Sequence, residues 1–102
     1  MREWTFLGSH AQVLLLIAQE PCTRLRDVSA ALDITDRTAF GIMTDLIDAG
    51  YVVKRKEGRR NCYEIQEHLP VRTSVGLERT VSDFLDLFVD TIRRAETRPH
   101  PS

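Results

Sequence analysis

The chain of 102 residues has few of the features that mark secreted, membrane or fibrous proteins. Its two cysteines, Cys22 and Cys62, are too few for a disulfide framework. Its longest apolar run, Val13 to Ala18, is far shorter than the ~20 residues that a membrane span needs. The N-terminal residues also lack the apolar stretch and small-residue cleavage site of a secretory signal. We therefore expect a cytoplasmic protein with no membrane partner.

Groupings that carry catalysis or hold metals are equally scarce. The sequence has no glycine-rich phosphate loop, no Ser/His/Asp grouping at a recognisable spacing and no acidic pair beside a base. The three histidines are scattered, and neither cysteine belongs to a Cys-x-x-Cys pair. We expect no enzyme, no cofactor and no metal site. Redox sensing by Cys22 or Cys62 stays open, because thiol reactivity depends on a pKa that sequence does not show.

Charge is balanced over the chain but not along it. The formal net charge is −1, with 28% charged and 42% hydrophobic residues, which suits one globular domain. Between Lys54 and Arg60, however, five cations and one anion give a net charge of +4. Such a patch on a slightly acidic body favours an anionic partner. The alternative is a solvated strand edge that its charges protect from aggregation.

In the N-terminal third, residues 3–7 alternate weakly and predict a short edge strand or an extended arm, and two helices are predicted after them. The pattern Ser9-x-x-Gln12 fits a capping box, and the dense apolar run behind it predicts a helix that is buried on most sides and ended by Pro21. A shorter helix follows, with Thr23 as its cap. Its apolar stripe has spacings of three and four and comprises Leu25, Val28 and Leu32.

A tight turn and a third helix come next. Asp33 tolerates the left-handed backbone that such a turn needs, and Thr35 suits the cap of the third helix. That helix is expected to end near Ala49, with Gly50 as its stop. Its inward face is predicted to comprise Ala39, Ile42, Met43, Leu46 and Ile47.

The following segment changes to the period of β-strands. β-prone residues flank a glycine-containing link at 57–60, which predicts a β-hairpin with an apolar base and a basic tip. Tyr51 and Tyr63 are expected in the core at that base. After a linker at 70–76, a last amphipathic helix is predicted over 77–97. A disordered tail is expected at 98–102.

Taken in order, helix, helix, short turn, helix and basic hairpin, the elements resemble a winged helix-turn-helix domain over 1–69. The residues resemble transcriptional regulators of the MarR and ArsR type over about 9–66. The stretch at 24–39, RLRDVSAALDITDRTA, is similar to their two-helix unit. The stretch at 46–55, LIDAGYVVKR, looks like the end of a recognition helix entering the wing, and GRRNCYEI at 58–65 looks like the wing.

This resemblance implies a mainly α fold with a β-hairpin wing, and a dimeric transcriptional regulator that binds double-stranded DNA. The helix at 36–49 is expected in the major groove, with the wing at 54–62 on phosphates and the minor groove. The expected DNA-binding residues are Thr35, Arg37, Thr38, Phe40, Gly41, Lys54, Lys56, Arg59, Arg60 and Asn61. The alternative function is a winged-helix module that docks on proteins and does not bind DNA.

Two features of the third helix depart from that resemblance. Phe40 and Gly41 stand where relatives usually carry polar or basic residues. Three aspartates, Asp36, Asp45 and Asp48, also add negative charge to the helix that is expected to approach DNA.

The last helix has an apolar stripe that a closed winged-helix core does not need. The helix either folds back on its own domain or pairs with a second copy of the chain. We expect the second, a dimerisation helix, which would also space two recognition helices on DNA. The expected dimer interface comprises Leu77, Val81, Phe84, Leu85, Phe88 and Ile92.

Overall fold

The computed structural model describes residues 7–71, 75–76 and 79–88. The chain divides into two units, Met1–Ile65 and Gln66–Ser102, and each is considered by itself. The strand expected over 3–7 and the tail expected at 98–102 fall outside the described residues, except for Leu7.

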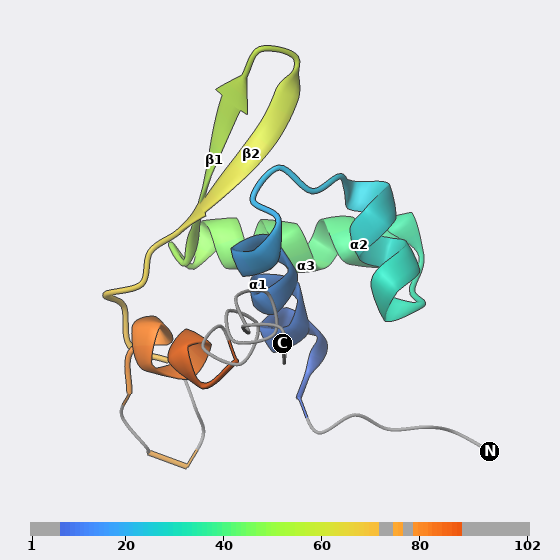
Figure 1. The fold of residues 1–102 in the computed structure, drawn as a ribbon. Helices are drawn as coiled ribbons and strands as arrows, with labels where there is room; N and C mark the ends of the chain where they lie inside the picture. The colour runs from blue at the N-terminus through green and yellow to red at the C-terminus, as the bar shows by residue number, and fades with distance from the viewer. Residues whose placement is uncertain (1–6, 72–74, 77–78, 89–102) are drawn as a thin grey trace, which may run out of the picture. The chain divides into compact units, whose positions relative to one another are not determined.

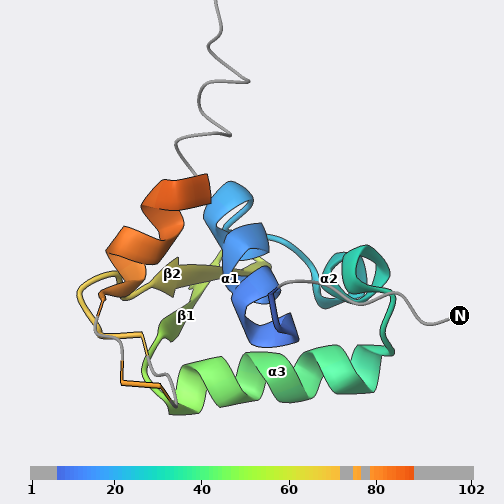
Figure 2. The ribbon, with the colours of Figure 1, turned by 90° about the horizontal axis from the view of Figure 1, so that it is seen from below.

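The first unit contains three helices and a β-hairpin (Figure 1). The helices are α1 (Ser9–Gln19), α2 (Leu25–Leu32) and α3 (Asp36–Asp48), and α1 and α2 pack against α3 from one side (Figure 2). Burial of apolar side chains at this meeting point drives the association of the helices. The core comprises Val13, Leu14, Ile17, Val28, Ala39, Ile42, Met43, Leu46 and Val52.

The turn between α2 and α3 confirms the expectations from the sequence. Asp33 has a φ of 57°, the left-handed conformation that ends α2. Thr35 has extended backbone, and its hydroxyl accepts a hydrogen bond from the Thr38 amide at 3.0 Å, which caps α3. After α3, Gly50 has a φ of 86°, as expected of a glycine that ends a helix.

The starts of α1 and α2 differ from the prediction. Gly8, not Ser9, has the extended backbone of an N-cap, so the Ser9 hydroxyl lies within the first turn and cannot cap it. Gln12 still reaches back, and its side-chain amide donates to the Leu7 carbonyl at 2.7 Å. The N-cap of α2 is Arg24 rather than Thr23, and no side chain caps this helix.

The hairpin is formed by β1 (Val52–Glu57) and β2 (Arg60–Ile65), which pair antiparallel from Val52↔Ile65 to Glu57↔Arg60. Gly58 lies in the two-residue turn with a φ of 64°, a conformation that favours glycine. At the base, Val52 is buried, and Tyr51 and Tyr63 pack against the core as expected. Three helices and a hairpin in this order are compatible with a winged-helix arrangement.

The second unit contains a helix over 81–88. Residues 69–71 run antiparallel to residues 79–81, joined by two backbone hydrogen bonds and a bridge between Pro70 and Thr80. The sequence predicted a start at residue 77, but Thr80 and Asp83 form a reciprocal cap, with the Asp83 amide donating to the Thr80 hydroxyl at 3.1 Å. Residues 79 and 80 therefore precede the helix, while residues 77–78 and 89–97 lie outside the described residues.

Two glycines give opposite predictions for stability. A Cβ added to Gly41 in α3 would meet nothing within 4 Å, so Gly41→Ala should raise the free energy of unfolding by about 1 kcal/mol through helix propensity. Gly58→Ala should lower the free energy of unfolding by about 1 kcal/mol, because the left-handed backbone at this position is strained for alanine. Urea unfolding followed by circular dichroism measures both. A loss of stability in Gly41→Ala would contradict the open surroundings of this position.

Candidate nucleic-acid interface

The outer face of α3 presents three of the predicted DNA-binding residues to solvent. Arg37, Phe40 and Gly41 are exposed, and Phe40 has 63% of its surface accessible. Within the described part of the chain, no hydrogen bond or ion pair holds the Arg37 guanidinium. These residues occupy the side of α3 opposite Ala39, Ile42 and the rest of its buried face.

Thr35 and Thr38, also predicted to bind DNA, form the cap of α3. Besides accepting from the Thr38 amide, the Thr35 hydroxyl donates to Thr38 Oγ1 at 2.9 Å. Both side chains are exposed, and their hydrogen bonds fix the start of the helix. That cap fixes the position of the first turn of α3, from which the Arg37 side chain projects.

Two of the three aspartates on α3 hold the helices together. Asp36 accepts a hydrogen bond from the Ser29 hydroxyl of α2, and Ser29 is buried. Asp45 Oδ2 lies 2.8 Å from His10 Nε2 of α1. The sequence suggested that these acids oppose an approach to DNA, whereas each also has a structural partner on a neighbouring helix.

The basic hairpin places its predicted contact residues on different faces. The register puts Lys54, Lys56 and Asn61 on one face, while Arg60 shares the other with Arg55 and Cys62. All of the predicted wing residues are exposed.

Two of the five cations in the basic segment have partners within the protein. Arg55 Nη2 lies 2.6 Å from Glu64 Oε1 on the neighbouring strand, and Arg60 Nη2 donates to the Cys22 carbonyl at 2.8 Å. Three cations of the segment, Lys54, Lys56 and Arg59, have no side-chain partner among the described residues. The salt bridge to Glu64 offsets the charge of Arg55, whereas the hydrogen bond to a carbonyl leaves Arg60 its positive charge.

The structure also contains a disulfide bond that the sequence did not predict. Cys22, in the loop between α1 and α2, and Cys62, in β2, form a disulfide across a separation of 40 residues. Beside it, the Tyr63 amide donates to the Pro21 carbonyl at 2.8 Å. Together with Arg60, these links join the loop to the outer edge of β2.

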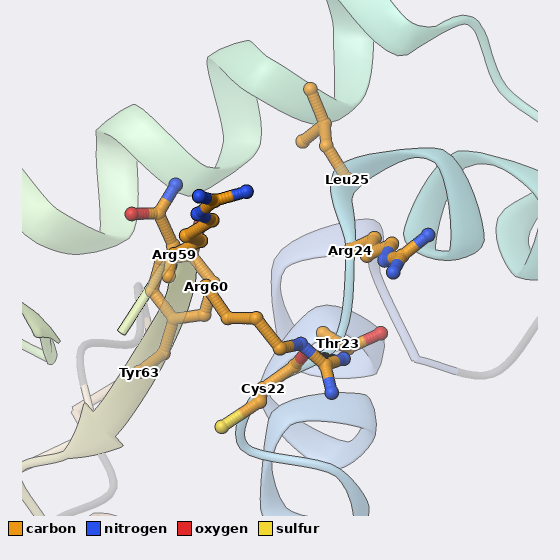
Figure 3. A pocket seen from close by; sticks show the side chains of 8 residues that line it. Cys22, Thr23, Arg24, Leu25, Arg59, Arg60 and Tyr63 are labelled. Carbon is orange, nitrogen blue, oxygen red and sulfur yellow. Dashed lines mark hydrogen bonds between the residues drawn. The ribbon is translucent and has the colours of Figure 1, made fainter. Parts of the chain in front are cut away.

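A pocket of about 390 Å³ lies at this junction (Figure 3). Thr23, Arg24 and Leu25 come from the loop and the start of α2, whereas the hairpin supplies the opposite wall. Burial raises the pKa of the Tyr63 phenol above its ordinary value. The residues that line the pocket are Cys22, Thr23, Arg24, Leu25, Arg59, Arg60, Asn61 and Tyr63.

One group of side chains has the composition of a metal site. Cys22, Glu57 and Cys62 offer ligand atoms that all lie within 4.8 Å of one another. Thiolates are the metal-binding form of cysteine, and the disulfide removes both. In this form of the protein, only the Glu57 carboxylate is left as a ligand.

The predicted dimer interface is described in part. Val81 and Leu85 are buried within the single chain, against the expectation of an uncovered stripe. Phe84 and Phe88 are half-buried, with ring centroids 5.4 Å apart. Leu77 and Ile92, also predicted for this interface, lie outside the described residues.

Comparison with known proteins does not assign the chain to a family. No protein-family model matches the chain, and no curated protein matches its sequence. Among the residues that the structure describes, no helix is both long and apolar enough to cross a membrane.

The disulfide gives a prediction for stability. A cross-link that closes a loop of 40 residues is worth about 4 kcal/mol in the chain-entropy model. We expect a reducing dithiol to lower the free energy of unfolding by about 2–4 kcal/mol. Urea unfolding with and without the reductant measures the difference. The Cys22→Ser/Cys62→Ser variant is the control, and an equal response of both proteins to the reductant would contradict the bond.

Proposed function

We propose that the chain is a DNA-binding transcriptional regulator in which α3 contacts the major groove and the β1–β2 hairpin contacts the phosphate backbone. The outer face of α3 carries this proposal: Arg37 and Phe40 are exposed there, and the Arg37 guanidinium forms no hydrogen bond or ion pair within the described residues. An α-helix fits the major groove, and an arginine near its start can reach the edge of a guanine.

The hairpin supports the same function through its charge. Lys54, Lys56 and Arg59 are exposed, and a hairpin that follows the recognition helix can bring such side chains to phosphates beside the groove. Each phosphate contact releases counterions, which makes the affinity depend on salt. Little sequence information is expected from this part of the interface.

A second function, docking on another protein, is favoured by one observation. Phe40 is 63% exposed in the middle of α3, and exposed aromatic side chains are common anchors of protein interfaces. The two functions differ in salt dependence and in their response to the loss of Arg37.

Arg37→Ala should weaken specific binding more than nonspecific binding. A bidentate contact to guanine contributes about 1–3 kcal/mol of discrimination, and its loss should relax the preference at one position of each half-site. Sequences selected from a random duplex pool by the wild type and by the variant measure this. A protein that selects no sequence and binds no duplex at low salt would contradict the proposed function and favour docking on a protein.

Lys56→Ala/Arg59→Ala should act differently. Both residues are exposed cations of the hairpin, so binding should weaken on all sequences, and the slope of log affinity against log salt should shrink by up to about two per chain. Arg79→Ala is a matched control, because Arg79 is an exposed cation of the second unit. Titrations of a fluorescent duplex at several salt concentrations give the slopes. An unchanged slope would remove the hairpin from the interface.

A homodimer held by the last helix completes this proposal. Phe84 and Phe88 are its testable members because they are half-buried and one helical turn apart. Phe84→Asp/Phe88→Asp should give a monomer whose first unit stays folded and whose affinity for a palindromic site falls sharply. Light scattering and circular dichroism test this. A dimer that persists, or a chain that unfolds, would place these side chains within the protomer.

A further inference from the structure

The pocket between the α1–α2 loop and β2 is rich in positive charge. Arg24, Arg59 and Arg60 line it, and no carboxylate is among its lining residues. Thr23 and Asn61 add neutral hydrogen-bonding groups. In Figure 3, Arg59 and Tyr63 come from the hairpin, and Thr23 and Arg24 come from the facing loop. Guanidinium groups pair with phosphate through charge-assisted and often bidentate hydrogen bonds. The lining therefore suits an anion.

One of the three arginines is already held in place. Arg60 Nη2 donates to the Cys22 carbonyl, which uses one of its five N–H donors and restrains the side chain. A restrained donor loses less conformational freedom when a ligand arrives. The Cys22–Cys62 disulfide restrains both walls in the same way, since it joins the loop to β2 beside the pocket.

The first turn of α2 adds donors at the same place. Its N-cap, Arg24, accepts backbone hydrogen bonds from Asp27 and Val28, but no side chain caps the helix. The amides of Leu25 and Arg26 consequently have no acceptor among the described residues. Leu25 lines the pocket, so the start of α2 with its free amides lies beside the arginines and adds to their preference for an anion.

The pocket is also larger and less polar than a bare phosphate needs. Its volume of about 390 Å³ is within the range of small-molecule sites, and Leu25 and Tyr63 give it apolar surface. We propose that this pocket binds a small molecule that joins a phosphate monoester to an apolar or planar group. The arginines bind the phosphate, while Leu25 and Tyr63 pack against the remainder.

Glu57, an acid near the pocket, should affect anion binding in the opposite direction to the arginines. The Glu57 carboxylate lies within 4.8 Å of the sulfur of Cys22, which is a pocket residue. Its negative charge opposes an anion in the pocket. Glu57→Gln should therefore tighten binding, whereas loss of an arginine should weaken it.

The test uses the oxidised, full-length protein without DNA, with phenyl phosphate and inorganic phosphate as probes. Backbone NMR titrations should give saturable shifts at Leu25, Arg26 and Asn61, with phenyl phosphate the tighter ligand. Arg24→Gln/Arg59→Gln should weaken binding by about tenfold or more, because two charge-assisted contacts are lost. Arg79→Gln is the control, since Arg79 is an exposed arginine outside the pocket. Shifts that do not saturate, or that Arg79→Gln reduces equally, would overturn the proposal.

A DNA arm separates a free ligand from a backbone phosphate. If a short duplex shifts the pocket amides while neither free phosphate does, the proposal is overturned and the pocket belongs to the DNA interface. If phenyl phosphate binds and no duplex does, the pocket proposal stands and the proposed function fails. Circular dichroism shows whether the double variant folds. Should it unfold, Glu57→Gln still decides, because weaker or unchanged binding in that variant contradicts the assigned charge balance.

Discussion

The position of the hairpin depends on its attachment to the loop between α1 and α2. A two-stranded hairpin is marginally stable alone, and Val52 and Cys62 are the buried residues of its two strands. The disulfide from Cys22, the hydrogen bond from Tyr63 to Pro21 and that from Arg60 to Cys22 all join β2 to this loop. The core of the helices thereby determines where the basic residues of the hairpin lie.

That attachment connects redox conditions to the arrangement of charge. Disulfides persist in oxidising surroundings and are rare in a reducing cytoplasm, where thiols exchange with a disulfide and open it. Reduction would leave two hydrogen bonds between the loop and β2, and one of them uses Arg60. Under the two proposals, the cysteines act on ligand binding through the position of the hairpin, although neither is a contact residue of the proposed DNA interface.

Local signals predicted most of the first unit. Asp33, Thr35, Gly50 and Gly58 each mark a backbone conformation that a few residue types favour, and the structure has all four as expected. The failures concern choices between neighbours or contacts over a distance. Whether Gly8 or Ser9 is the N-cap of α1 depends on a small difference in backbone conformation. The pairing of Cys22 with Cys62 depends on how the loop packs against β2. A separation of 40 residues in the sequence does not indicate that contact.

The same limit applies to the charged residues, whose sequence pattern gives their number but not their partners. The sequence counted five cations in the basic segment, and the structure adds that Arg55 pairs with Glu64 and that Arg60 donates to the loop. Conversely, Asp36 and Asp45 looked like obstacles to DNA but join α3 to α2 and α1.

Under the proposed function, α3 recognises DNA with the side chains that have no partner among the described residues. Its exposed face offers one unpaired guanidinium, an aromatic ring and a glycine whose Cβ position is open. Such a face has few groups to hydrogen-bond to bases, while the missing side chain at Gly41 permits a close approach. Apolar contact between Phe40 and a thymine methyl, together with phosphate contacts from the hairpin, then supplies most of the affinity. Specificity accordingly depends on Arg37 and on the fit of α3 into the groove more than on the number of base contacts.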